Sequence, residues 1–322
     1  MDITPKEHNT MINYSKAVIV GTGFVGSSAA YALMLKGLFS EIVLIDNNVA
    51  RAEGEAMDIG HGLPYASPMN IHAGTYEECA DACIVVITAG AAQKPGETRL
   101  DLIKKNSAIM RSIVGQIKET AFEGILLIVA NPVDVLTHVA LTESGYAPNR
   151  VFGSGTVLDT ARFKYELSKH LQVDARNVHG VIIGEHGDSE LPVWSVTNIA
   201  GIPINDFCAI RGHVNHEEGM RKIYESVRDS AYEIIERKGA TYYGIATAIA
   251  RICEVIVKDQ HTMLPVSVEL DGVYGLSGLA LSIPSIVGRN GVEKILELTL
   301  NFEEKQKLLQ SAKTLKGIID TL

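Results

Sequence analysis

The sequence is poor in cysteine, and the few cysteines form no recognisable pattern. Its 322 residues include only four: Cys79, Cys83, Cys208 and Cys253. They are too scattered for a disulfide framework. Cys79 and Cys83 lie one helical turn apart, but no second Cys/His pair completes a zinc site. We therefore expect buried free thiols in a reducing compartment and no bound metal.

Long apolar runs and an excess of basic residues are also lacking. No stretch approaches the roughly 18 apolar residues of a membrane span, and residues 1–15 contain no apolar core typical of a signal peptide. The net charge is −9, from 29 basic and 38 acidic residues, and there is no Lys/Arg-rich run. These features predict a cytoplasmic protein without a nucleic-acid or membrane partner.

The first half alternates short apolar runs with amphipathic segments. The apolar runs are Lys16–Val20, Glu41–Asp46, Cys83–Thr88 and Ile125–Ala130, and the segments between them are Gly23–Lys36, Val49–His61 and Leu100–Thr120. A strand that is covered by helices on both faces needs such a nearly continuous apolar run. The alternation therefore predicts an α/β fold with a doubly wound parallel sheet.

The pattern changes after about Val151. Apolar runs in VHGVIIGE and LPVWSV follow one another without a helix between them, which indicates antiparallel strands. Two helices are expected at Glu217–Lys238 and Tyr243–Val257, more strand between Met263 and Val287, and a last helix capped by Asn301. We predict a dinucleotide-binding domain, with the N-terminal tail, over residues 1–155 and an α+β substrate domain over residues 156–322.

A glycine motif follows the first predicted strand. GTGFVG places Gly21, Gly23 and Gly26 in the G-x-G-x-x-G pattern, and Asp46 ends the next strand 20 residues after Gly26. The glycines allow a tight turn, a close approach of the pyrophosphate and close helix packing, and the carboxylate binds the ribose hydroxyls. This context predicts a Rossmann-type site for NAD, because Asp46 would repel the 2′-phosphate of NADP.

Three further segments carry polar side chains that are ambiguous when each is taken alone. The loop Thr88–Leu102, with Gln93 and Arg99, is either a lid or a charged surface loop. Asn131 in NPVD is either a helix cap or a site residue. Asp159 and Arg162 in LDTARF are three residues apart on a predicted helix, which also fits a surface ion pair.

Taken together, the motifs resemble one known family. GTGFVG, Asp46, GEAMDIGHG, AGAAQKPGETR, NPVD, GSGTVLDTARF, GEHGDSE and KGATYYGIA occur in order, from about Lys16 to the C-terminus. They resemble the bacterial NAD-dependent L-lactate dehydrogenases of the lactate/malate dehydrogenase family. The resemblance implies reversible hydride transfer between NADH and pyruvate, giving L-lactate and NAD, in a homotetramer.

The resemblance also implies a role for individual residues. His186 is similar to the catalytic acid/base, for which a near-neutral pKa would suit both directions, and Asp159 to its carboxylate partner. Arg162 resembles the residue that grips the substrate carboxylate, and Arg99 the lid arginine that polarises the ketone. Gln93, Asn131 and Thr241 are implied around the substrate. The implied cofactor contacts are Gly21, Gly23, Phe24, Val25, Gly26, Asp46, Thr88, Ala89, Gly90, Asn131 and Ile245. We expect Asp188 and Glu190 to serve local structure.

Alternative functions and one regulatory question stay open. Malate dehydrogenases have arginine at the position of Gln93, and a dehydrogenase for bulkier 2-keto acids, such as the 2-hydroxyisocaproate type, fits the same motifs. A metal-dependent NAD glycosidase would need a Cys/His pair that is not found, and a non-catalytic NAD sensor would not need His186. In related bacterial enzymes an arginine and a histidine bind fructose 1,6-bisphosphate; here Lys164 stands at the arginine position and His179 is retained.

Overall fold

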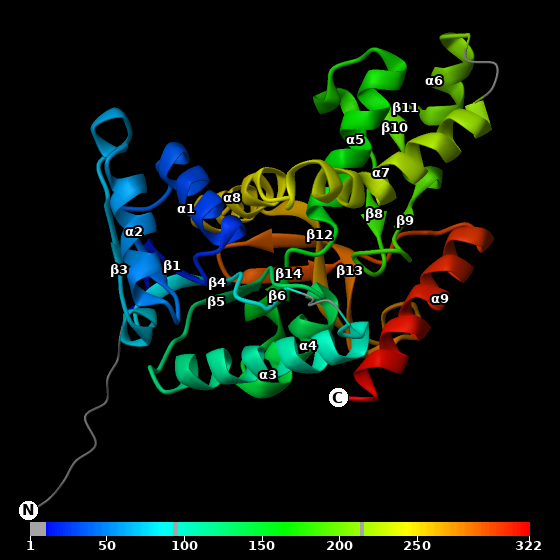
Figure 1. The fold of residues 1–322 in the computed structure, drawn as a ribbon. Helices are drawn as coiled ribbons and strands as arrows, with labels where there is room; N and C mark the ends of the chain where they lie inside the picture. Colours follow the sequence, from blue (N-terminus) through cyan, green and yellow to red (C-terminus); the bar gives the residue numbers. More distant parts are fainter. Residues whose placement is uncertain (1–10, 93–95, 213–215) are drawn as a thin grey trace, which may run out of the picture.

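A single large sheet organises the computed structural model, which describes residues 11–92, 96–212 and 216–322. Within these residues the sheet has nine strands in the order β14-β13-β12-β6-β5-β4-β1-β2-β3 (Figure 1). Its parallel strands are β1 (Asn13–Val20), β2 (Glu41–Ile45), β3 (Asn70–Ala73), β4 (Ala82–Ile87), β5 (Ile125–Ile128) and β6 (Val151–Gly153). The strand order reverses between β1 and β4, and ligands of open α/β sheets bind at such a reversal.

The four parallel strands predicted from the apolar runs are confirmed. β1 pairs in parallel with both β2 and β4, and β4 pairs with β5. Two parallel strands, β3 and β6, were not predicted. β3 is a partly exposed edge strand of four residues and β6 has only three residues, so neither produces an apolar run long enough to recognise.

Helices cover both faces of the sheet (Figure 1). α1 (Phe24–Lys36), α2 (Val49–Gly60) and α8 (Tyr243–Val257) lie on one face, and α3 (Arg99–Lys118) and α4 (Val133–Ser144) on the other. Each face has its own apolar core, in which Leu33 and Ile249 represent the first and Met110 and Leu136 the second. α3 begins at a capping box in which Thr98 and Asp101 bond each other's backbone N–H groups.

The second half of the chain extends the same sheet with antiparallel strands, as predicted. These are β12 (Thr262–Asp271), β13 (Ser277–Gly288) and β14 (Gly291–Ile295). β12 joins the parallel part by pairing with β6 through Ser267 and Gly153. Gly153 permits this close approach, because a Cβ there would lie 2.4 Å from Thr137 Oγ1 and 2.9 Å from Ser267 Cβ.

A smaller lobe with a third apolar core completes the molecule. It contains α5 (Val157–Leu171), β7 (Val178–His179), β8 (Ile182–Ile183), β9 (Leu191–Pro192), β10 (Asn198–Ile199), β11 (Ile202–Pro203), α6 (Ile204–Ile210) and α7 (His216–Lys238). β8 and β9 are antiparallel, as predicted. α9 (Phe302–Ile319) begins at the predicted cap, where Asn301 and Glu304 form a capping box.

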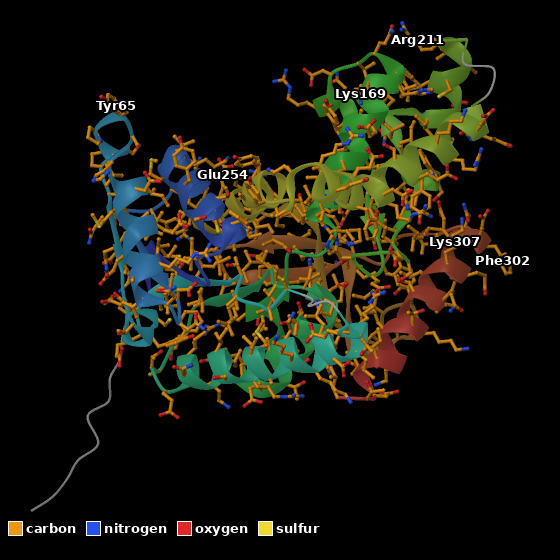
Figure 2. All side chains as sticks on the ribbon, in the orientation of Figure 1. Tyr65, Lys169, Arg211, Glu254, Phe302 and Lys307 are labelled. Atoms are coloured by element: carbon orange, nitrogen blue, oxygen red, sulfur yellow. The ribbon has the colours of Figure 1, made fainter. Side chains whose placement is uncertain are left out.

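Figure 2 draws the side chains on the ribbon and labels six of them. The Glu254 carboxylate on α8 forms ion pairs with Lys36 of α1 at 2.8 Å and with Lys258 at 2.9 Å. The pair with Lys36 connects α1 to α8. Lys169 lies on α5 and Arg211 directly follows α6, so both belong to the smaller lobe. In the part of the chain that the structure describes, no helix combines the length and apolar character needed to cross a membrane.

Candidate active site

A histidine and a carboxylate from different segments meet at the C-terminal edge of the sheet. Asp159 and Arg162 project from one face of α5, and His186 lies in the loop between β8 and β9. His186 Nδ1 is 2.5 Å from Asp159 Oδ2, and Arg162 Nη1 donates to Asp159 Oδ1 at 2.9 Å. Asp159 is only 2% exposed. The structure therefore brings together the three residues that two separate motifs contributed.

The backbone of His186 is held by a residue that sequence reasoning missed. Asp134, 1% exposed and on α4, accepts the His186 N–H at 2.7 Å through Oδ2. Its Oδ1 accepts the Ser267 hydroxyl at 2.6 Å and the Ser282 hydroxyl at 3.3 Å. Burial raises the pKa of Asp134 to about 6, although these hydrogen bonds oppose the rise. Asp134 is the last residue of NPVD, but its contacts lie 52 to 148 residues away and no local pattern indicates them.

The electrostatics of the pair favour a charged imidazole. Burial lowers the pKa of His186, but the charge of Asp159 and its hydrogen bond to Nδ1 outweigh burial and raise the pKa to about 9. The Asp159 carboxyl is held ionised despite burial, because His186 and Arg162 lower its pKa. The pKa of His186 is thus higher than the near-neutral value that we expected, and the imidazolium predominates at neutral pH.

A cavity of about 350 Å³ opens beside His186. The predicted residues that line it are Arg99, Asn131, Asp159, Arg162 and His186. α7 contributes Arg228, Ala231, Tyr232 and Ile235, which sequence reasoning did not identify, and the loop contributes Glu190. Gln93 lies outside the described residues. Thr241, just before α8, and Ile245, in the first turn of α8, are partly buried and are not among the described residues that line this cavity.

Arg99, the first residue of α3, is turned toward acidic residues of the His186 loop. Its Nη2 donates to Glu185 Oε1 at 3.3 Å, and its Nη1 lies 3.8 Å from Asp188 Oδ2. The side chain is 61% exposed, whereas Glu185 is buried. Asp188 also accepts a hydrogen bond from Tyr232. Arg99 already lines the cavity, and it can therefore bind a ligand there only by exchanging these partners.

A second cavity, of about 520 Å³, lies at the strand-order reversal. Its walls include the predicted residues Gly21, Gly23, Asp46, Thr88, Ala89 and Gly90. A Cβ on Gly23 would meet nothing within 4 Å, so the space in front of α1 is open, whereas a Cβ on Gly26 would lie 1.9 Å from Gly21 O. No side chain caps α1 at Gly23. An open helix N-terminus with free N–H groups fits a pyrophosphate.

Asp46 is preorganised as an anion at this cavity. Its Oδ2 accepts from Thr22 N at 2.7 Å and Thr22 Oγ1 at 3.0 Å, and its Oδ1 accepts from Asn48 N at 2.9 Å. Burial opposes ionisation, but these bonds lower the pKa of Asp46. Arg51, which the sequence reasoning did not consider, lines the same cavity. The predicted Phe24 is exposed and stacks on Tyr242 with ring centroids 5.3 Å apart.

The two residues of the possible effector site lie on neighbouring elements. Lys164 is a half-buried residue of α5, and burial lowers the pKa of its ammonium group. His179 is an exposed residue of β7, where it pairs with Asn198 of β10. Neither residue forms a salt bridge within the described chain.

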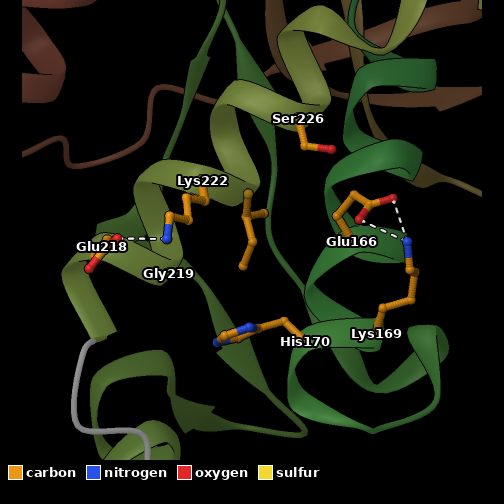
Figure 3. Close-up of a pocket in the computed structure, with 8 residues that line it drawn as sticks. Glu166, Lys169, His170, Glu218, Gly219, Lys222 and Ser226 are labelled. Carbon is orange, nitrogen blue, oxygen red and sulfur yellow. Dashed lines mark hydrogen bonds and ion pairs between the residues drawn. The ribbon is translucent and has the colours of Figure 1, made fainter. Parts of the chain in front are cut away.

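A third cavity, of about 550 Å³, lies between α5 and α7 (Figure 3). Its charged side chains pair with one another: Lys169 with Glu166 at 3.2 Å, and Lys222 with Glu218 at 2.6 Å. These pairs neutralise the walls, and the cavity contains none of the residues around His186. We assign it no chemical role.

Both halves of the chain match one known protein family. The model of the NAD binding domain of lactate/malate dehydrogenases matches residues 15–153, and that of the alpha/beta C-terminal domain matches residues 156–322. The chain is 54% identical to an L-lactate dehydrogenase of Acetivibrio thermocellus, covering 95% of this chain and 97% of that protein. It is 52% identical to one of Thermoanaerobacter pseudethanolicus, covering 96% and 99%.

Solved structures show the same likeness. The minor L-lactate dehydrogenase from Enterococcus mundtii in its ligands-bound form has a TM-score of 0.93 and 46% identity, covering 96% of this chain and 99% of that chain. The ligands-unbound form of the same enzyme has a TM-score of 0.88 and 45% identity, covering 95% and 96%. The likeness extends over both halves of the sheet.

Proposed function

Since the chain belongs to the lactate/malate dehydrogenase family, as an oxidoreductase of the L-lactate dehydrogenase type, we propose how its two site cavities perform the reduction of pyruvate to L-lactate by NADH. The His186 cavity binds pyruvate and the cavity in front of α1 binds NADH. The observation that carries this proposal is the buried Asp159 carboxylate, which holds both the His186 imidazole and the Arg162 guanidinium.

The cofactor cavity contains groups suited to each polar part of a dinucleotide. The N-terminus of α1 at Gly21 and Gly23 would hold the pyrophosphate, and Asp46 would bind the ribose hydroxyls. When bound, NADH supplies the hydride that reduces the carbonyl carbon. The protein supplies orientation and charge around that transfer.

Arg162 is suited to hold the substrate carboxylate. Its hydrogen bond to Asp159 uses Nη1. The other N–H groups of the guanidinium can form a bidentate pair with a carboxylate, which fixes the orientation of the keto group. Arg162 thereby places the substrate next to His186, which lines the same cavity.

His186 moves the proton. Asp159 occupies Nδ1, so Nε2 is the atom that donates to the oxygen of the forming alkoxide. The pKa of about 9 keeps this proton in place at neutral pH, which favours reduction, while lactate oxidation needs the neutral imidazole. Arg99 would leave Glu185 and Asp188 when the lid closes, and would then stabilise the developing negative charge.

The test is NADH oxidation by pyruvate with the parent protein and with His186→Asn. The variant should still bind NADH, measured by fluorescence titration, while turnover falls by about 10²–10⁴-fold, the range of general acid catalysis. His61→Asn, on an exposed turn after α2, is the matched control and should retain activity. A parent without pyruvate turnover, or a His186→Asn protein at near-normal rate, would overturn the proposal.

We also propose that the chain acts as a homotetramer, as the resemblance implies. Large apolar side chains are exposed on neighbouring elements of one sheet face: Tyr31, Leu35, Val49, Met57, Tyr65 and Tyr243. Clustered exposed apolar surface is typical of subunit interfaces. Light scattering coupled to gel filtration should give four times the chain mass of 34.8 kDa, and a monomer would contradict the proposal.

A further inference from the structure

Glu190 places a second carboxyl group inside the active site. The residue is 4% exposed and lines the His186 cavity. One of its carboxyl oxygens lies within 4.8 Å of both an Asp159 oxygen and a His186 ring nitrogen. Its Oε1 is buried and has no hydrogen-bond partner among the residues that the structure describes. A buried acid without a partner at a reaction site requires an explanation.

The compensating groups near this site are already bound to Asp159. Asp159 receives the hydrogen bonds of His186 at 2.5 Å and Arg162 at 2.9 Å, so it carries the negative charge. Two buried carboxyls this close do not both ionise unless further positive charge is present. Glu190 is the partner that keeps its proton. Burial, and then the charge of Asp159, raise the pKa of Glu190 to about 9.

The other charged groups around Glu190 do not replace the missing partner. Arg228 of α7 is bonded to Asp229 at 2.8 Å and lies over the Tyr224 ring. The Tyr224 hydroxyl donates to the backbone oxygen of Glu190, not to its carboxyl. Among the described residues, the charged and titratable groups that face this region are Arg99 on α3, Asp159 and Arg162 on α5, His186 and Asp188 on the loop, Tyr224, Arg228, Asp229 and Tyr232 on α7, and Asp134 on α4 behind His186.

We propose that Glu190 is a positioning residue for the anionic substrate: only its protonated form leaves Arg162 available to a substrate carboxylate, and its ionisation closes the site to that anion. The inference rests on the proposed function of Arg162. A negative Glu190 beside Asp159 would repel the incoming carboxylate and compete for the same guanidinium. A neutral Glu190 avoids both effects and leaves the Asp159–His186 pair unchanged.

The expected signature lies in the alkaline pH dependence of pyruvate reduction. The reaction needs a protonated His186 and a protonated Glu190, so kcat/KM falls as pH rises through both ionisations. At pH values well above both pKa values, the loss of each proton lowers kcat/KM about tenfold per pH unit. The kcat/KM of the parent should therefore fall about 100-fold per pH unit. Glu190→Gln mimics the neutral acid and removes one of the two ionisations. Its kcat/KM should therefore fall only about tenfold per pH unit. Near neutral pH its kcat/KM should stay within a few-fold of the parent.

The experiment measures kcat/KM for pyruvate at saturating NADH from about pH 6 to about pH 10.5, with return to neutral pH as a check on inactivation. Glu225→Gln removes an exposed carboxyl of α7 that pairs with Arg221, and it should keep the parent profile. Parent-like steepness in Glu190→Gln would overturn the inference, because a merely structural role would leave the profile unchanged.

A second measurement does not depend on turnover. In the parent labelled with ¹³C at glutamate carboxyls, one glutamate resonance should titrate far above the usual glutamate range, and it should vanish in Glu190→Gln. If no glutamate titrates above about pH 7, the inference fails even when pyruvate is reduced. If that resonance is present but pyruvate is not turned over, the proposed function fails and the protonated Glu190 stands.

Discussion

Replacing Asp159 with asparagine should change how the reaction depends on pH. Burial lowers the pKa of His186, but the charge and hydrogen bond of Asp159, with smaller contributions from the charges of Glu190 and Asp134, raise it from 6.5 to about 9. The difference between these two pKa values corresponds to roughly 3 kcal/mol of imidazolium stabilisation. At about pH 7.5 the protonated fraction of His186 would therefore fall from nearly all to about a tenth or less.

The full effect requires a second substitution, because Glu190 lies within 4.8 Å of the same atoms. Without the Asp159 charge, Glu190 ionises more readily and partly replaces it beside His186. Because an ionised Glu190 closes the site to the substrate anion, we expect the alkaline fall of kcat/KM in Asp159→Asn to move to lower pH and to reflect Glu190 as well as His186. In Asp159→Asn/Glu190→Gln only His186 is left to titrate, and the fall should lie well below pH 9, near about pH 6.5. The loss of kcat/KM in these variants relative to the parent should grow as pH rises and shrink as pH falls.

The assay is the initial rate of NADH oxidation with pyruvate across the pH range, with NADH binding measured in parallel. Unchanged NADH affinity would show that the cofactor cavity is intact. If the alkaline fall of the double variant stays near pH 9, where the parent value places it, Asp159 does not set the charge of His186 and the electrostatic reasoning is refuted.

Three further predictions concern selectivity and regulation. NADH should be used at least about 100-fold more efficiently than NADPH, and Asp46→Ser should narrow the gap because Arg51 lines the same cavity; equal use by the parent would contradict this. Gln93→Arg should shift kcat/KM from pyruvate toward oxaloacetate by several powers of ten, since arginine pairs with the second carboxylate; an unmoved ratio would exclude Gln93 as the discriminating residue. Fructose 1,6-bisphosphate should activate weakly, because Lys164 lacks the bidentate fork of an arginine; strong activation at micromolar effector would show that Lys164 with His179 suffices.

The parts of the fold that follow from local pattern could be predicted. β1, β2, β4 and β5 are buried on both faces, and that requirement produces the apolar runs. Two glycines of GTGFVG meet a backbone constraint: Gly21 has a positive φ of 98°, and a Cβ on Gly26 would collide with Gly21 O. Asp159 and Arg162 share a helix face because of their spacing, and His186 was joined to them through the family resemblance.

The rest of the site depends on packing between distant segments. Glu190 was expected to serve local structure, yet α5 and α7 bury it beside Asp159, and the sequence around it does not indicate this. Asp134 reaches His186 only because α4 and the β8–β9 loop meet behind the cavity. Whether Thr241 faces the substrate depends on how α7 and α8 meet, which no periodicity specifies.

The pairing of β6 with β12 means that the chain cannot be cut between its two halves. A fragment ending near residue 155 would leave β6 as a bare edge, with unpaired N–H and C=O groups and Phe152, which is fully buried in the intact chain, partly uncovered. The complementary fragment would expose β12 in the same way. Both fragments should aggregate when expressed alone, and mixing them should recover solubility only if this strand pair re-forms. The boundary between the two family models therefore separates motifs in the sequence, but it lies within one continuous sheet.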